Sequence, residues 1–337
     1  MKETIYFGTY TRRISEGIYT AQLDTDTGIL SDLELKIKEH SPTYLSIDKK
    51  GNIYSVGSND GQGGIAAYDA NNELLNYVVK DGASLCFLAI DEDRDFVYGA
   101  NYHTGQVMVY KRDQDGKLHL SDWIQHTGFG PHENQEVPHV HYTDLTPDKY
   151  LVTCDLGTDK VTTYDLIDGK LKEINSYDAS PGSGPRHLVF KNTDKIAYLI
   201  CELNSTIEVL IYDGLGEFHK LQTISTLPDD ADKEEFNATA AIRMTSDDKF
   251  VYASNRGHNS IVVYESLADG TLEKIQTISS FGDIPRDINL SKGEKVLIVA
   301  NQDTDNVTTY LKDEQTGLLT KVQDDFFVPE AVCVYPA

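Results

Sequence analysis

The chain has 337 residues, of which 39% are hydrophobic, and its formal net charge is −24. This excess of acid repels nucleic acids and anionic membranes, so we expect neither as a partner. The longest apolar runs are too short to span a bilayer, and the start of the chain lacks the apolar segment of a signal peptide. Four widely spaced cysteines with no CxxC pair indicate a reducing compartment, and we expect a cytoplasmic protein.

Seven segments share one pattern: a β-rich run, a short polar link, and a second β-rich run that ends near Tyr. The first is "IYFGTYTRRISEGIYTAQLD" and the last is "LIVANQDTDNVTTYL". The segments begin at residues 5, 53, 97, 151, 197, 251 and 297. A repeat of about 49 residues is typical of a β-propeller blade.

Each segment is followed by a turn and a third apolar run, as in "ADGTLEKI". Gly or Asn in these turns supplies the positive φ that tight hairpins need. From the second segment onward, one more short strand precedes each segment, joined to it by a turn such as "TPDK" or "TSDDK". Each repeat is therefore predicted to be four short antiparallel strands.

The two ends of the chain complement each other. The first segment lacks the strand that precedes the others, and the final stretch "VPEAVCVYPA" resembles such a strand with nothing after it. We expect this last strand to complete the first blade, which also removes an exposed sheet edge. The prediction is an all-β, seven-bladed β-propeller forming a single domain over residues 1–337; an open β-solenoid is the alternative.

In a propeller, the starts of the innermost strands and the ends of the second strands meet at one mouth of the central channel. The unusual polar residues of this chain fall at those positions. At the starts they are His139, His141, Arg186, His187, Arg243 and Arg286. At the ends they are Asn101, Asp155, Glu202, Asn255, Arg256, Asn301 and Gln302. Four of only eight arginines are in this set, and Arg suits bidentate binding of carboxylate or phosphate. We predict a cationic pocket for a small anionic substrate.

The pair His139 and His141 is absent from the other repeats. Residues i and i+2 of a strand share a face, so both rings are expected to face the channel. Three roles are possible for the two histidines: acid–base catalysis, metal binding, or a purely structural role. Glu202 is either reactive or only a partner for an arginine. Asn255, Asn301 and Gln302 either cap strand ends or orient a ligand.

The motifs "FGTYT", "GANYHTGQV", "VPHVH", "GPRHLVF", "CELNSTIEV", "YASNRGHNSI", "PRDINLS" and "VANQDTDNV" run along essentially the whole chain. They resemble the seven-bladed propeller lactonases, a family that includes bacterial 6-phosphogluconolactonases and is related to fungal carboxymuconate-lactonizing enzymes. The resemblance implies hydrolysis of 6-phospho-glucono-δ-lactone in the oxidative pentose phosphate pathway, without a metal or organic cofactor. It places the active residues at His141, Arg186, Glu202 and Arg256.

Lactone hydrolysis needs a base for water, donors for the oxyanion and a proton for the ring oxygen. We expect His141 or Glu202 as base, and Arg186, with Arg256, as oxyanion donors. The remaining predicted residues are expected to bind substrate, with Arg243, Arg256 or Arg286 holding a phosphate. Two other classes stay open: a lactonizing cycloisomerase or a lactonase for another acidic sugar, and a non-catalytic propeller that binds a partner. The sequence does not indicate an oligomeric state.

Overall fold

The computed structural model describes residues 1–193, 195–232 and 235–337. Within these ranges the regular structure is entirely β, from strand β1 to strand β28. None of the described residues forms a helix long and apolar enough to cross a membrane. The strands form seven sheets of four strands each, as the repeat predicts. The four cysteines (Cys86, Cys154, Cys201 and Cys333) are free thiols.

The chain falls into two compact units. The first unit comprises Met1–Lys38, Leu188–Ile211 and Lys220–Ala337, and the second comprises Glu39–His187 and Tyr212–His219. Each unit is described by itself below. Our expectation of one domain over residues 1–337 stays a prediction.

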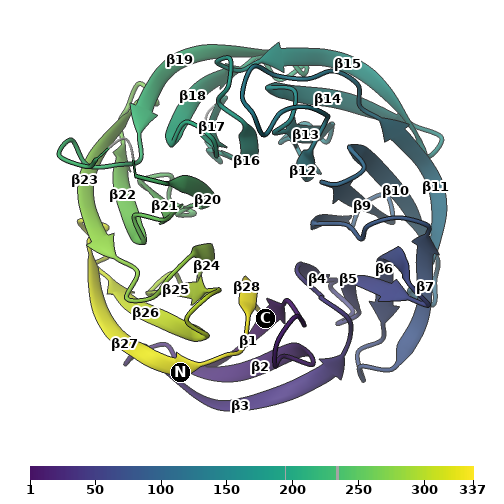
Figure 1. The fold of residues 1–337 in the computed structure, drawn as a ribbon, viewed down its shortest axis with the longest axis horizontal. Coiled ribbons are helices and arrows are strands. Elements are labelled where there is room, and N and C mark those ends of the chain that lie inside the picture. Colours follow the sequence, from purple (N-terminus) through teal and green to yellow (C-terminus); the bar gives the residue numbers. More distant parts are fainter. Residues whose placement is uncertain (194, 233–234) are drawn as a thin grey trace. The chain divides into compact units, whose positions relative to one another are not determined.

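The first unit contains three complete sheets (Figure 1). The sheet that includes both chain termini has the order β28 (Ala331–Pro336), β1 (Lys2–Thr9), β2 (Gly17–Asp24), β3 (Ile29–Lys38). The next has β20 (Ala238–Met244), β21 (Phe250–Arg256), β22 (Ser260–Ser266), β23 (Leu272–Ser279). The third has β24 (Pro285–Leu290), β25 (Val296–Asn301), β26 (Asn306–Lys312), β27 (Leu319–Phe327).

The second unit also contains three complete sheets. One has β4 (Leu45–Ile47), β5 (Ile53–Asn59), β6 (Gln62–Tyr68), β7 (Leu74–Lys80). Another has β8 (Phe87–Asp91), β9 (Phe96–Asn101), β10 (Gln106–Arg112), β11 (Leu118–Gln125). The third has β12 (Val140–Leu145), β13 (Leu151–Asp155), β14 (Lys160–Ile167), β15 (Lys170–Asp178). The seventh sheet has strands in both units: β16 (Pro185–Phe190), β17 (Ile196–Cys201), β18 (Thr206–Tyr212), β19 (Phe218–Ser225).

The C-terminal strand completes the first sheet as the sequence predicts. Strand β28 pairs antiparallel with β1, with Phe7 opposite Val334 and Tyr6 opposite Tyr335. It thereby covers the edge of β1 that β2 leaves open, and an uncovered edge of this length would invite pairing with another chain.

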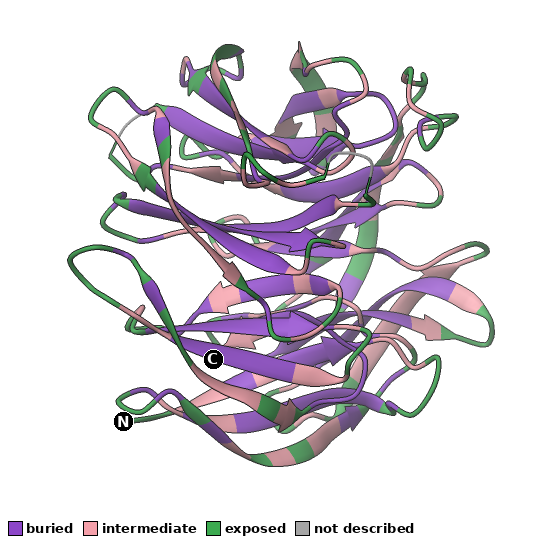
Figure 2. Ribbon diagram, turned by 60° about the vertical axis from the view of Figure 1, so that its left-hand side comes forward, coloured by how far each residue is buried: buried purple, intermediate pink, exposed green. Residues whose placement is uncertain are grey.

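Burial follows the position of a strand in its sheet. Every residue of β9, β17 and β25 is buried, whereas an outer strand such as β15 contains only exposed and half-buried residues. Figure 2 shows the same pattern, with exposed residues concentrated in turns and outer strands. In the first unit, apolar side chains of β1, β2 and β28 pack against those of β25 and β26 in one cluster. The sheets are thus held face to face by their middle strands, where each buried Val, Leu or Ile contributes about 1.5–3 kcal/mol.

Tyrosines on the second strands connect neighbouring sheets. The buried Tyr198 hydroxyl donates to the carbonyl of Gly270 at 3.0 Å, and Tyr252 donates to Gly317 at 2.8 Å. In both cases the acceptor lies in the turn between the third and fourth strands of the next sheet in the chain. A large ring with a polar tip suits this place.

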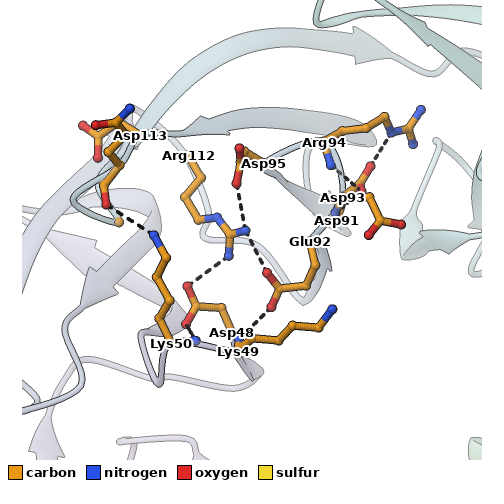
Figure 3. A network of polar contacts seen from close by, with 12 residues as sticks. Asp48, Lys49, Lys50, Asp91, Glu92, Asp93, Arg94, Asp95, Arg112 and Asp113 are labelled. Atoms are coloured by element: carbon orange, nitrogen blue, oxygen red, sulfur yellow. Dashed lines mark hydrogen bonds and ion pairs between the residues drawn. The ribbon is translucent and has the colours of Figure 1, made fainter.

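Arg112 in the second unit serves a structural purpose (Figure 3). Its buried guanidinium pairs with Asp48 at 2.9 Å, Glu92 at 2.8 Å and Asp95 at 3.1 Å. The network joins turns of the β4–β7 and β8–β11 sheets. Because it is enclosed and paired with three carboxylates, this arginine holds the turns together and is not a candidate for ligand binding.

The Gly-rich segment "NDGQGG" at residues 59–64 has the composition of a flexible loop but is part of a regular hairpin. Gln62–Tyr68 is strand β6, and Asn59 pairs with Gln62 across a tight turn. A Cβ on Gly64 would lie 2.2 Å from the Val78 carbonyl oxygen, and one on Gly63 would lie 2.3 Å from the Ser84 nitrogen. These glycines permit close backbone packing rather than flexibility.

Candidate active site

The His139–His141 segment in the second unit lies at a β-bulge. Val140 pairs with Asp155 and Tyr142 pairs with Cys154, which leaves His141 as the extra residue of β12. The same irregularity makes Arg286 the extra residue of β24 in the first unit, between Pro285 and Asp287. A bulge redirects a side chain, so the simple i, i+2 rule that we applied to the histidines does not hold here. Sequence periodicity gives no sign of it.

Both histidines nevertheless contact one ring, that of Tyr102. The His139 ring stacks on Tyr102 with centroids 4.2 Å apart, and His141 meets its edge at 5.8 Å. His139 Nδ1 lies 2.8 Å from the Tyr102 carbonyl oxygen. Because a carbonyl only accepts, Nδ1 holds the proton in this hydrogen bond, and Nε2 is the basic nitrogen of the neutral ring.

A second pair of predicted residues adjoins His141. Its ring centroid lies 5.2 Å from that of His187, which also packs against Phe87 at 5.1 Å. Arg186 is 2% exposed and donates from its guanidinium to His187 Nε2 at 3.3 Å. Three predicted residues, His141, His187 and Arg186, thus form one buried group in the second unit.

Asp155 holds the backbone of this group in place. One of its oxygens accepts from the His139 N–H at 2.8 Å and from the Gly157 N–H at 3.0 Å. The other lies 2.8 Å from His126 Nδ1, and His126 Nε2 is 2.8 Å from the Tyr164 hydroxyl. Asp155 is fully buried, so its charge is compensated by these donors rather than by water.

The first unit holds the other two residues assigned by the resemblance. The guanidinium of Arg256 pairs with Glu202 at 2.8 Å, and the two side chains are 10% and 17% exposed. Arg256 also donates to the Thr239 carbonyl at 3.0 Å, while the Thr239 hydroxyl donates to the Cys201 carbonyl at 2.8 Å. Thr239 therefore fixes the arginine and the strand end that carries Glu202. The pair is partly open to solvent and oriented, as a reactive carboxylate requires.

Arg243 and Arg286 differ in their surroundings. Arg243 pairs with the buried Asp287 at 3.0 Å, and Asp287 accepts from the Val334 N–H at 2.8 Å, so Arg243 helps to join β20, β24 and β28. Arg286 lies over the ring of Tyr10, with 5.5 Å from its guanidinium carbon to the ring centroid. Its closest polar contact is with the Gln302 amide oxygen at 3.5 Å.

The predicted amides Asn255 and Asn301 are fully buried. Asn255 donates to the Thr226 carbonyl and to the Ser260 hydroxyl, and Asn301 donates to the Ser280 carbonyl and to the Thr308 hydroxyl. These contacts favour the strand-capping alternative for both residues. Gln302 is only half-buried.

The predicted residues thus occur in two sets, one in each unit. His139, His141, Arg186 and His187 belong to the second unit. Glu202, Arg243, Arg256, Arg286 and the three amides belong to the first. The prediction that all of them line one mouth stays a prediction. Among the residues that the structure describes, no group of three or more His, Cys, Asp or Glu side chains is placed to hold a metal ion.

Sequence reasoning missed the residues that surround these groups. Tyr102, Phe87 and His126 do not stand out in the repeat, although Tyr102 directly follows the predicted strand end at Asn101. Cys86 was used only as an indication of the redox compartment; it is half-buried, and its thiol lies 3.6 Å from the His141 carbonyl oxygen. Arg12 was not assigned a role, and it lies on the Tyr10 ring at 3.7 Å.

Residues 4–336 match the family model described as "Lactonase, 7-bladed beta-propeller". The chain belongs to this lactonase family. The match covers nearly the whole chain and, with the seven four-stranded sheets, confirms the seven-bladed propeller. Membership also makes the protein a lactone-hydrolysing enzyme, which confirms the family resemblance seen in the sequence.

Relatives of this lactonase agree along their full lengths. The 6-phosphogluconolactonase of Bacillus subtilis is 42% identical over 340 residues, with 98% of this chain and 97% of the relative covered. The crystal structure of a protein from Lactobacillus plantarum has a TM-score of 0.98 at 44% identity, with both chains fully covered. The periplasmic gluconolactonase PpgL of Pseudomonas aeruginosa has a TM-score of 0.92 at 26% identity, covering 100% of this chain and 99% of its own.

Proposed function

We propose that the protein hydrolyses 6-phospho-glucono-δ-lactone to 6-phosphogluconate, the second step of the oxidative pentose phosphate pathway. The observation that carries this proposal is the 42% identity to the Bacillus subtilis 6-phosphogluconolactonase over almost the whole of both chains. The two groups of polar residues supply the chemistry that such a hydrolysis needs. His141 and Arg186 lie together in one group, and Glu202 and Arg256 form the other.

In the proposed reaction a base takes a proton from water, and the water oxygen attacks the lactone carbonyl carbon. The bond between that carbon and the ring oxygen then breaks, and a proton passes to the ring oxygen to give the free hydroxyl and the acid. His141 or Glu202 serves as the base, and the other is available to deliver the proton. Arg186 and Arg256 stabilise the negative charge that develops on the carbonyl oxygen.

The arrangement of each group supports these roles. Arg186 is buried and is held against His187, so its position costs little reorganisation when the oxyanion forms. Glu202 is oriented by Arg256, which is itself fixed on the Thr239 carbonyl. His139 is proposed to contact the substrate through Nε2, which its hydrogen bond to the Tyr102 carbonyl leaves basic. His187 is proposed to contact it through Nδ1, which carries the proton of the neutral ring when Nε2 accepts from Arg186.

A second candidate is hydrolysis of the non-phosphorylated lactone, and the likeness to the Pseudomonas aeruginosa gluconolactonase favours it. A lactonizing cycloisomerase is less well supported, since the relative named 6-phosphogluconolactonase covers 98% of the chain at 42% identity. We also propose a cytoplasmic location, on the ground that the four cysteines are free and three of them are buried.

The deciding experiment is hydrolysis of freshly generated 6-phosphogluconolactone, corrected for its spontaneous hydrolysis, with glucono-δ-lactone in parallel. We expect a rate well above background and a higher kcat/KM for the phosphorylated compound. Acceleration of glucono-δ-lactone alone would favour the second candidate. Acceleration of neither compound would overturn the proposal.

A further inference from the structure

The segment after strand β1 is held rigidly by a single carboxylate. Glu330 is 3% exposed, and its two oxygens accept from the backbone N–H groups of Arg12, Arg13, Ile14 and Ser15 at 2.9–3.1 Å. The Tyr10 N–H also donates to the Glu330 carbonyl at 3.0 Å. All of these residues belong to the first unit. The backbone that carries Tyr10 and Arg12 is therefore fixed before any ligand arrives.

Two guanidinium groups lie on the ring of Tyr10. The guanidinium carbon of Arg12 is 3.7 Å from the ring centroid, and that of Arg286 is 5.5 Å from it. Arg12 comes from the segment after β1, whereas Arg286 is the extra residue in the bulge of β24. Stacking on an aromatic face orients a guanidinium but leaves its N–H edge available to an anion.

The lack of a carboxylate here is unusual for this protein. Among the described residues, ion pairs are formed by Arg13, Arg94, Arg112, Arg243 and Arg256. Within the described part of the chain, neither Arg12 nor Arg286 forms an ion pair, although the protein has 54 acidic residues.

The acidic residues nearest to Arg12 and Arg286 in sequence have other partners: Glu16 pairs with Lys38 at 2.5 Å, and Asp287 pairs with Arg243 at 3.0 Å. Three further carboxylates also accept from other donors. Glu330 is occupied by the four backbone N–H groups, and Asp305 accepts from Arg13 at 2.7 Å and from the Glu330 N–H at 2.7 Å. Asp303 accepts from the Gln302 amide at 2.9 Å. Two positive charges within 5.5 Å of one ring centroid repel each other, and a bound dianion would relieve that repulsion.

We infer that Arg12, Tyr10 and Arg286 form a subsite for a phosphate monoester dianion, the phosphate of a phosphorylated sugar lactone. The assignment of that ligand rests on the proposed function. Each guanidinium offers paired N–H donors to phosphate oxygens, and contact with the Tyr10 ring orients both. The subsite lies outside the residues to which we assign the bond-breaking steps.

The test compares ligands that differ only in the phosphate. Binding of 6-phosphogluconate, gluconate and inorganic phosphate is measured by calorimetry at one fixed ionic strength. We expect the wild-type protein to bind 6-phosphogluconate more tightly than gluconate. In the Arg12→Gln/Arg286→Gln variant, the affinity for 6-phosphogluconate falls about 30-fold or more, whereas that for gluconate changes less than about 2-fold.

Arg13→Gln is the matched control, since it removes the same charge from the neighbouring position, and we expect it to change the affinity for 6-phosphogluconate less than about 3-fold. Tyr10→Phe keeps the ring and is expected to bind as the wild type does, while Tyr10→Leu binds more weakly. Thermal unfolding of every variant shows that each is folded. Wild-type affinity in the double variant, equal losses for both sugar acids, or no phosphate preference in the wild type would overturn the subsite.

Lactone hydrolysis by the same proteins separates this inference from the proposed function. A protein that binds 6-phosphogluconate through the two arginines but hydrolyses no lactone supports the subsite and overturns the function. A protein that hydrolyses the lactone with equal KM in wild type and double variant supports the function and overturns the subsite. If both hold, the double variant raises KM for the phosphorylated lactone and leaves the rate with glucono-δ-lactone unchanged.

Discussion

Asp155 is a fully buried residue of the second unit that holds the backbone of His139 in place. Its two oxygens accept from the His139 and Gly157 N–H groups and from His126, and the side chain is inaccessible to water. His139 in turn stacks on Tyr102, against which His141 also packs. A carboxylate at this position can accept all three hydrogen bonds, whereas an amide must turn an N–H₂ group toward one of these donors.

Replacing Asp155 by Asn is therefore expected to lower the free energy of unfolding by about 1–3 kcal/mol, because a buried donor loses its acceptor. Activity should fall as well, through displacement of the His139 backbone. The loss should appear mainly in kcat, since neither Asp155 oxygen is free for the substrate. Urea denaturation and steady-state kinetics measure the two effects. Asp178→Asn is the control, because Asp178 forms an exposed pair with Lys160 at 2.6 Å and should matter little.

At the scale of elements, the residue Glu330 connects the C-terminal strand to the segment after β1. Burial alone would raise the pKa of Glu330, but the backbone N–H groups of Ser15, Ile14, Arg13 and Arg12 outweigh burial, and the pKa lies below its usual value. Glu330 also has a φ of 51°, a left-handed conformation that costs a non-glycine residue about 1 kcal/mol. Hydrogen bonds from four backbone N–H groups to its side chain explain why a glutamate, rather than a glycine, occupies this left-handed position.

A lowered pKa in the folded state fixes the sign of the pH dependence. The stabilisation by Glu330 is fully present above the ordinary glutamate pKa and is lost as the pH falls through the lowered folded value. Glu330→Gln should be less stable than the wild type by about 1–2 kcal/mol at pH 7, and this gap should narrow under acid. Denaturation curves of both proteins at pH 7 and at pH 3.5 test the expectation. A gap that is constant or wider in acid would contradict it.

The strands were predictable because their signal is local and repeated. Alternating β-rich runs, turn residues and a 49-residue period lie in contiguous sequence, and even the pairing of β28 with β1 followed from counting strands. The bulge at His141, the position of Arg286 over Tyr10 and the contacts of Asp155 with His126 depend on residues that are separated in sequence. No single-sequence pattern encodes them, and the bulge overturned the simple alternation rule. The tight packing of Gly63 and Gly64 against Ser84 and Val78 likewise depends on the folded backbone.

For the whole molecule, the dominant electrostatic fact is the net charge of −24, from 54 acidic and 30 basic residues. Like charges on one folded chain repel one another and favour expansion. Raising the NaCl concentration from about 0.01 M to about 0.5 M shortens the Debye length from about 30 Å to a few ångströms. The melting temperature should therefore rise with salt. A fall in melting temperature would mean that the screened ion pairs outweigh the general repulsion.

The proposed catalytic residues belong to two different units. The kinetics of single and double variants can test whether they act on the same substrate molecule. His141 and Arg186 belong to the second unit, and Glu202 and Arg256 to the first. If His141 and Glu202 act on the same substrate molecule, as base and acid, each is needed for the same transition state. Their separate losses should then not add.

We expect His141→Asn and Glu202→Gln each to lower kcat for 6-phosphogluconolactone by about 10²–10⁴-fold. The kcat of the double variant should be close to that of the slower single variant. Once one of the two proton transfers is lost, the other no longer accelerates the reaction. Glu202→Gln combined with Asp178→Asn is the control pair, and its effects should simply multiply. Multiplicative losses in the His141/Glu202 pair would show that the two residues do not share a reaction step, and full activity in both folded single variants would remove them from the mechanism.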